Sequence, residues 1–252
     1  MIVELIGSPG CGKTSLIPSL VKKFSEQDFN PFTVVEASRP VVSRTLIGKS
    51  INTFLPESLR DPLLWQVFYF SAYLSRRSFS KGYPNLVAHV RKTQSIREVP
   101  AEERGHALYW WFHLSGYYQF LKPRLYTNEV LILDEGFSHR VVQLFASDFE
   151  SSNRGDVLIY LDLIPRPDIL ICVNAPASIC EQRVHERGLW SRMQHKSRQQ
   201  ISQFVSNSHS IIDAAVKELK LKEWVIVDID NSGAGLAPAE EELSGKLSHL
   251  LN

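Results

Sequence analysis

The chain has 252 residues, enough to bury a substantial core as one domain or as one domain with an inserted subdomain. Hydrophobic residues make up 44% and charged residues 22%, and 28 basic residues against 27 acidic ones give a formal net charge of +1. This balance excludes an overall field that would attract nucleic acid or an anionic membrane.

The cysteines and the apolar runs indicate in which cellular compartment we expect the protein. The three cysteines have no metal-site or disulfide spacing, which favours a reducing, cytoplasmic location. The densest apolar run, Leu63 to Leu74, is interrupted by Gln66 and Ser71 and is too short to cross a bilayer. The first residues are predicted to form a strand and a loop, so we expect no signal peptide. We therefore expect neither nucleic acid nor membrane as a partner.

Residues 7–14 carry the most specific pattern in the chain. They match the phosphate-binding pattern G-x-x-x-x-G-K-[ST] without a gap, between an apolar strand at 2–6 and a helical pattern that begins at Ser15. The glycines let the backbone turn its N–H groups toward a polyphosphate, and the helix adds the positive end of its dipole. We expect a nucleoside triphosphate to be bound by Gly7, Ser8, Pro9, Gly10, Cys11, Gly12, Lys13, Thr14 and Ser15.

Two residues of this loop have distinct expected roles. Lys13 would reach the β- and γ-phosphates, and the Thr14 hydroxyl would bind Mg²⁺. The plain alternative is a glycine-rich turn that happens to contain a lysine, and the flanking strand and helix argue against it.

A second strand is predicted at 32–35, followed by a loop at 36–40. Ligands of open parallel sheets lie beyond the carboxyl ends of the strands, so Glu36 and Arg39 are predicted near the phosphate loop. Glu36 would take a proton from a substrate hydroxyl, and Arg39 would hold an anion. The alternative is an ordinary strand-to-helix connection without a chemical role.

Residues 41–127 are predicted to be helices separated by prolines, with no convincing strand. They contain two aromatic-rich stretches, around residues 65–73 and 109–120. Most of these rings are expected in the core, while one or two could stack on a flat substrate if the helices form a wall of an acceptor pocket.

The next strand, 130–133, ends in Asp134 and Glu135, which is the Walker B arrangement. Asp134 would bind Mg²⁺ directly or through water. Glu135 would orient or deprotonate the attacking group. If that group is a hydroxyl of a substrate, the protein is a kinase, and if it is water, the protein is an ATPase. Arg140 is expected to contact the acceptor or the phosphate.

A fourth strand at 169–173 leads into a helix in which Arg183 and Arg187 share one face. Arg192, Lys196 and Arg198 extend this into a basic cluster, which suggests a lid at 183–198 over the transferring phosphoryl group; a solvated basic helix is the alternative. A long apolar stripe at 201–219, a strand at 224–229 and a helix at 238–250 complete a single domain, 1–252, without repeats or linkers.

The order of these parts resembles the nucleoside monophosphate kinase-like group of P-loop proteins, which includes thymidylate kinases and deoxynucleoside kinases. The resemblance implies an α/β three-layer sandwich with a five-stranded parallel sheet in 2-3-1-4-5 order. It also implies that the helical insertion at 41–127 forms a wall of the acceptor site, and that adenine packs near Arg183 and the 231–235 loop, which contains Ser232.

The resemblance is incomplete at two motifs. Thymidylate kinases have an arginine where this chain has Glu135. Glu36 resembles the catalytic glutamate of deoxynucleoside kinases, but their Glu-Arg pair after the third strand is not matched. The Asp-Glu-Gly sequence here is similar to that of kinase-like ATPases whose acceptors are not defined.

Two functions are compatible with these residues. The first is an ATP- and Mg²⁺-dependent kinase for a small nucleotide-like or sugar-like acceptor. In it Lys13 holds the donor, Arg187, Arg183 or Arg192 stabilises the transition state, and Glu36 or Glu135 is the base. The second is an ATP-hydrolysing regulatory or partner-binding protein in which Glu135 activates water. A homodimer is compatible with both.

Overall fold

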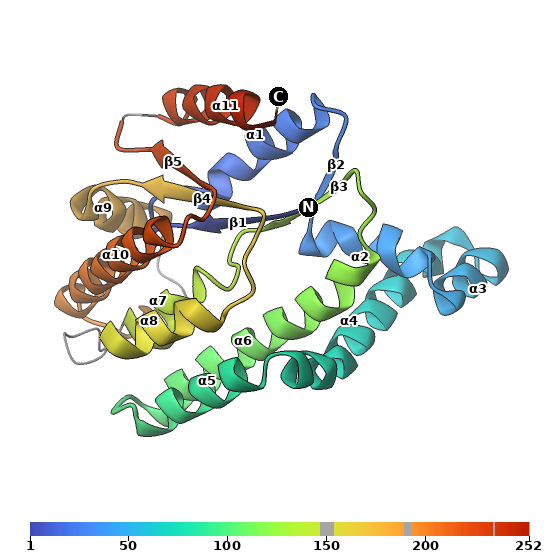
Figure 1. Ribbon diagram of the computed structural model, residues 1–252, viewed down its shortest axis with the longest axis horizontal. Helices are drawn as coiled ribbons and strands as arrows, with labels where there is room; N and C mark the ends of the chain where they lie inside the picture. Colours follow the sequence, from blue (N-terminus) through green and yellow to red (C-terminus); the bar gives the residue numbers. More distant parts are fainter. Residues whose placement is uncertain (147–153, 189–192, 234, 252) are drawn as a thin grey trace.

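The computed structural model describes residues 1–146, 154–188, 193–233 and 235–251 (Figure 1). Its centre is a parallel sheet in the order β2-β3-β1-β4-β5, which confirms the predicted topology and the α/β class. The strands are β1 (Ile2–Ile6), β2 (Asn30–Thr33), β3 (Glu129–Leu133), β4 (Ile169–Asn174) and β5 (Ile226–Asp230).

Helices cover both faces of the sheet (Figure 1). Their bounds are α1 (Lys13–Ser25), α2 (Val34–Ser43), α3 (Leu46–Phe54), α4 (Glu57–Gly82), α5 (Pro84–Ile96), α6 (Ala101–Leu121), the 3₁₀ turn η1 (Lys122–Arg124), α7 (Arg140–Phe145), α8 (Arg154–Leu163), α9 (Ala177–Arg187), α10 (Arg198–Leu221) and α11 (Ala237–Leu251). Within the described ranges, none of these helices is long and apolar enough to span a membrane.

The two faces of the central strands pack into separate hydrophobic clusters. Both β1 and β3 are buried along their whole length, as expected for parallel strands covered on both sides. On one face Val3 and Leu5 pack with α1 and α11, and on the other Ile2 and Ile6 pack with α2, α4 and α6. The result is the predicted three-layer sandwich.

The insertion between β2 and β3 is helical, as predicted, but the expectation that most of its rings lie in the core is wrong. Four rings of the two aromatic stretches are buried (Phe68, Trp111, Tyr118 and Phe120), whereas six are exposed (Trp65, Tyr69, Phe70, Tyr73, Tyr109 and Trp110). Helices α4 and α6 approach closely at Gly116, where a Cβ atom would lie 2.3 Å from the Ala72 carbonyl oxygen. Phe79 stacks on Phe137 with ring centroids 5.4 Å apart, and Trp111 is fully buried beside them. This contact joins the insertion to the loop that follows β3, and so to the predicted site.

One predicted boundary is wrong in a way that affects the site. Strand β2 ends at Thr33 and α2 begins at Val34, so the predicted strand 32–35 and loop 36–40 do not form. The reason is a capping box: Glu36 Oε2 accepts from the Thr33 amide at 2.8 Å, while the Glu36 amide donates to Thr33 Oγ1 at 3.5 Å. Glu36 and Arg39 therefore lie in the first turns of a helix.

Candidate functional site

The phosphate loop connects β1 to α1 and is clamped by neighbouring elements. Gly10 and Gly12 have φ values of 86° and 96°, in the left-handed region that favours glycine. A Cβ atom at Gly12 would lie 2.3 Å from Asn231 Nδ2, and that amide donates to the Cys11 carbonyl at 2.7 Å. The segment that follows β5 therefore braces the loop.

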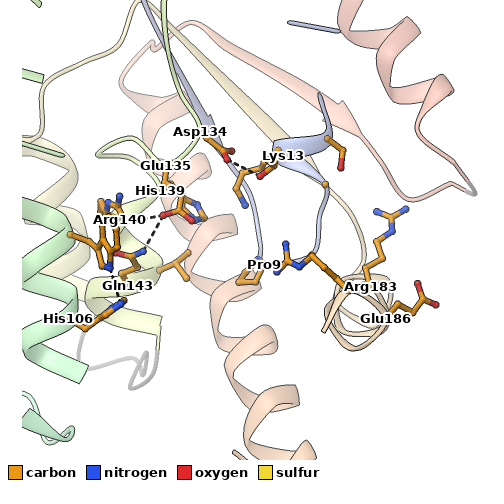
Figure 2. Close-up of a pocket in the computed structure, with 17 residues that line it drawn as sticks. Pro9, Lys13, His106, Asp134, Glu135, His139, Arg140, Gln143, Arg183 and Glu186 are labelled. Atoms are coloured by element: carbon orange, nitrogen blue, oxygen red, sulfur yellow. Dashed lines mark hydrogen bonds and ion pairs between the residues drawn. The ribbon is translucent and has the colours of Figure 1, made fainter. Parts of the chain in front are cut away.

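A cleft of about 790 Å³ opens over this loop (Figure 2). It is lined by Pro9, Gly10, Gly12, Lys13, Thr14, Ser15, His106, Trp110, Asp134, Glu135, His139, Arg140, Val142, Gln143, Arg183, Glu186 and Arg187. Gly7, Ser8 and Cys11, predicted with the rest of the loop, are outside this lining. Ser8 and Cys11 are buried, and Ser8 Oγ lies 3.3 Å from His209 Nδ1 of α10.

Lys13 and Thr14 connect the loop to the end of β3. Lys13 Nζ donates to the Gly7 carbonyl at 2.8 Å and to the Ser8 carbonyl at 3.3 Å, which holds the ammonium group against the loop. Thr14 Oγ1 donates to Asp134 Oδ2 at 2.8 Å. Two motifs that are 120 residues apart in sequence thus share one hydrogen bond.

Asp134 follows β3 directly and is half-buried. Burial raises its pKa, against the hydrogen bond from Thr14 and the charge of Lys13, and its Oδ1 atom is buried without a hydrogen-bond partner. A bound cation would satisfy that oxygen. Magnesium prefers oxygen ligands and often takes only one or two from the protein, so the Thr14 hydroxyl and the Asp134 carboxylate fit it.

The loop after β3 is held from beneath by a buried carboxylate. Glu4 of β1 is 1% exposed and accepts from the amides of Phe137 at 3.1 Å and Ser138 at 2.9 Å. A Cβ atom at Gly136 would lie 2.2 Å from Glu4 Cδ, so only glycine fits there without a shift. Burial raises the pKa of Glu4, and the two amides and Arg140 oppose that effect.

Helix α7 forms one wall of the cleft. Arg140 Nη1 lies 3.0 Å from Glu135 Oε2, and Gln143 Nε2 donates to the same oxygen at 3.3 Å. The Arg140 side chain is only 7% exposed, and burial lowers its pKa while Glu135 counteracts this. Glu135 is 47% exposed and is thus oriented by two neighbours while remaining open to the cleft.

His139 is buried on the same wall. Burial, followed by the charges of Lys13 and Arg140, lowers its pKa well below the ordinary value, so the ring is neutral at pH 7. Its Nδ1 atom has no hydrogen-bond partner. Figure 2 shows His139, Arg140 and Gln143 on the opposite side of the cleft from Arg183 and Glu186.

Helix α9 forms the opposite wall. Arg183 donates to the carbonyls of Asn231 at 2.9 Å and Gly233 at 3.1 Å, which fixes the loop after β5 beside the cleft. Arg187 lines the cleft as predicted. Ser232, predicted near the adenine, is outside the lining and bonds to Asp230, with its amide 3.0 Å from Oδ1.

The predicted acceptor residues are only partly brought together. Arg140 lines the cleft, but Glu36 and Arg39 do not. Glu36 is exposed and caps α2, and Arg39 pairs with Asp61 at 3.3 Å on the surface. Neither residue therefore lines the cleft, and their predicted roles toward the acceptor stay predictions. Arg192, and the 189–192 part of the predicted lid, lie outside the described residues.

Several lining residues were missed in the sequence. His139 and Gln143 closely follow Asp134, so a search of the segment after Walker B would have found them. His106 and Trp110 come from α6, which lies in the insertion expected to form a wall of the acceptor site, but neither residue was singled out. Glu186 lies between the two predicted arginines of α9.

Comparisons with known proteins give a similarity in chain path only. No protein-family model matches the sequence, and no curated protein matches it. Among solved structures, the deoxyadenosine kinase from M. mycoides with bound dCTP is 13% identical with a TM-score of 0.44, over 99% of this chain and 100% of that one. The structure of the same enzyme with the products dCMP and dCDP is 12% identical to this chain with a TM-score of 0.46, over 99% of this chain and 100% of that one. Its structure with bound dATP is 14% identical to this chain with a TM-score of 0.48, over 98% of this chain and 100% of that one. We therefore take the function from the geometry of the cleft itself.

Proposed function

We propose that the protein is an ATP- and Mg²⁺-dependent phosphotransferase that acts on a small hydroxyl-bearing acceptor. The observation that supports this most is the 2.8 Å hydrogen bond between Thr14 and Asp134, with the other Asp134 oxygen left unpartnered. A hydroxyl and a carboxylate beside the predicted phosphate loop would together hold the metal ion that phosphoryl transfer uses.

The donor side is formed by the phosphate loop and α9. The loop amides and Lys13 would hold the donor phosphates, assisted by the dipole of α1. Magnesium, held by Thr14 and Asp134, would neutralise charge on the β- and γ-phosphates. Arg183 and Arg187 lie on the facing wall and would stabilise charge on the transferring group.

The acceptor side suits a neutral compound. Its cation, Arg140, is paired with Glu135, and Asp134 adds a further negative charge nearby. Within the described residues of this wall, a second phosphate group would face two carboxylates and a cation that is already paired, so a nucleoside-like or sugar-like alcohol fits better there than a phosphorylated acceptor. The acceptor oxygen would attack the γ-phosphorus as the bond to the leaving ADP breaks, and Glu135 would take the hydroxyl proton.

The same carboxylate also supports a second function. Glu135 is 47% exposed in the cleft and would orient water equally well, which would make the protein an ATP-hydrolysing regulator. In that case the exposed rings of the insertion would contact a protein partner.

Turnover of radiolabelled MgATP separates these functions. Phosphate release and labelled products are measured without acceptor and with a panel of nucleosides and sugars, using Asp134→Asn as the background control. The kinase proposal predicts trace hydrolysis alone and a labelled product with at least one alcohol. Brisk acceptor-free hydrolysis would support the regulator, and no turnover under any condition would contradict both.

A further inference from the structure

His139 is a buried polar residue whose position packing does not explain. It stands at the N-terminal cap position of α7, but its side chain caps no amide of that helix. It is 4% exposed and nevertheless lines the cleft. In the described part of the chain, its Nδ1 atom is buried without a hydrogen-bond partner. Such an atom destabilises a protein, so a ligand that bonds to the ring would account for a histidine here.

The ring lies beside two cations. Figure 2 shows His139 between Lys13 of the phosphate loop and Arg140 of α7. Burial, and then the charges of these two residues, lowers the pKa of His139 well below its ordinary value, so the imidazole is neutral at pH 7. A neutral imidazole has one N–H donor and one acceptor nitrogen. It can therefore donate to an anion without adding a third positive charge to this side of the cleft.

The two ring nitrogens differ in their access to the cleft. Among the described residues, Nδ1 of His139 is a buried unpartnered atom and Nε2 is not, so Nε2 is the nitrogen available to a ligand. On one side of the ring, Lys13 is expected at the β- and γ-phosphates of the donor. On the other, Arg140 Nη1 lies 3.0 Å from Oε2 of Glu135, the proposed base. The phosphoryl group that moves from donor to acceptor would pass between these two sides.

The geometry points to His139 as a hydrogen-bond donor, through Nε2–H, to the γ-phosphoryl group of the bound triphosphate. This inference rests on the proposed function and adds to it a residue that distinguishes ATP from ADP. The loop amides would hold phosphates that both nucleotides carry, whereas a donor on the α7 side of the cleft would meet only the terminal group. The histidine exchanges no proton, and its N–H would stabilise charge on the oxygens of the transferred group.

Three variants at this position separate a donor from a packing residue. His139→Gln keeps an N–H donor at the distance of Nε2, His139→Asn places its amide nearer the backbone, at the distance of Nδ1, and His139→Leu has no donor. The matched control is His113→Leu. His113 is also 4% exposed, but its Nε2 atom lies 3.0 Å from the Tyr69 hydroxyl and the residue does not line the cleft.

Nucleotide titrations test the inference without requiring turnover. AMP-PNP, a non-hydrolysable ATP analogue, and ADP are each titrated by calorimetry, with Mg²⁺, into the wild type and the variants. We expect His139→Asn and His139→Leu to weaken AMP-PNP binding about tenfold, as for the loss of one hydrogen bond to a charged group, and to leave ADP binding unchanged. His139→Gln and His113→Leu should keep the wild-type preference for AMP-PNP.

Two results would overturn the inference. One is an equal loss of AMP-PNP and ADP affinity in His139→Asn and His139→Leu, because the ring would then support the whole site and not one phosphate. The other is an unchanged AMP-PNP affinity in both variants. If His139→Leu does not fold, the two amides decide alone: a preference lost in His139→Asn and kept in His139→Gln supports the inference, and equal behaviour of the two contradicts it.

The outcomes also separate this inference from the proposed function. A preference for AMP-PNP that depends on His139, in a protein that transfers no phosphoryl group to any acceptor, would keep the donor and refute the kinase. Transfer by a protein whose preference for AMP-PNP is unchanged in His139→Asn and His139→Leu would keep the kinase and refute the donor.

Discussion

The two walls of the cleft are built in different ways. The phosphate-loop side consists of consecutive residues, and the groups proposed to bind phosphate there are mostly backbone amides in a loop that contains the positive-φ glycines Gly10 and Gly12. The α7 wall combines residues of the loop after β3 and of α7, which are close in sequence, with residues of α6, which only the folded chain brings beside them. A site formed by backbone groups of consecutive residues can therefore be recognised as a motif in the sequence, whereas a site formed by side chains from several elements depends on tertiary packing.

The two sides also differ in how many of their buried polar atoms have a hydrogen-bond partner. Around the loop, Lys13 and Asn231 make hydrogen bonds to loop carbonyls. At the end of β3 and on α7, Asp134, His139 and Arg140 each keep an unpartnered buried atom and a pKa shifted by burial. We expect substitutions in the second group to separate stability from activity, because unsatisfied polar groups destabilise the ligand-free protein.

The largest effect is expected from Asp134→Asn. Removing the carboxylate should lower MgATP turnover by about 100-fold or more, because the metal's contribution to the transition state is lost. The side-chain amide oxygen of the introduced asparagine can still accept from Thr14, so the fold should persist. Unchanged steady-state turnover would remove Asp134 from its proposed role.

The same variant should be more stable than the wild type without ligand. The folded-state pKa of Asp134 is raised by burial above its ordinary value of 3.8, so its ionised form destabilises the fold at pH 7. This destabilisation fades as the pH falls through the raised pKa toward 3.8. Thermal melts of both proteins should therefore differ at pH 7 and converge in acid; a lower melting temperature for the variant at pH 7 would contradict this.

A second effect concerns the support of the α7 wall. Gly136→Ala places a Cβ against buried Glu4 and should lower the free energy of unfolding by about 1–3 kcal/mol. The matched control is Gly105→Ala in α6, where nothing lies within 4 Å of the added atom. Helix propensity makes that change neutral or stabilising, by up to about 1 kcal/mol. Denaturant unfolding that ranks the two variants equally would show that Glu4 does not fix this loop.

A smaller effect concerns the cap of α2, which contains one of the two candidate bases. Thr33→Ala removes this cap and should lower the free energy of unfolding by about 1 kcal/mol. Glu36→Gln preserves a capping box, so it should leave both unfolding and turnover unchanged. If turnover of Glu36→Gln falls while its melting curve stays the same, Glu36 and not Glu135 is the base.

The smallest effect is expected at Arg39. Its ion pair with Asp61 is exposed, with the side chains 63% and 62% accessible, and such pairs contribute less than about 1 kcal/mol. Arg39→Ala should therefore alter neither stability nor the acceptor KM measurably. A raised acceptor KM would bring Arg39 back to the acceptor site.

The strands β1, β3 and β4 were predictable because their apolar runs and the phosphate loop are local signals, whereas the order of the strands in the sheet came from the family resemblance. The prediction failed at Glu36, where the choice between strand and helix depended on a cap that involves Thr33. The sequence could not show that Trp110 lines the cleft while Trp111 is buried, because the environments of these two adjacent residues depend on how α6 packs against α4 and Phe137. Local chemistry was predictable, and contacts between distant elements were not.

Calorimetric titration of ATP tests the central claim most directly. We predict one ATP bound per chain, with an affinity that falls when Mg²⁺ is removed with EDTA and falls about tenfold or more in Lys13→Ala. Equal affinity in wild type and Lys13→Ala, or no binding by the wild type, would contradict the assignment of residues 7–14 and Asp134 as a triphosphate and metal site.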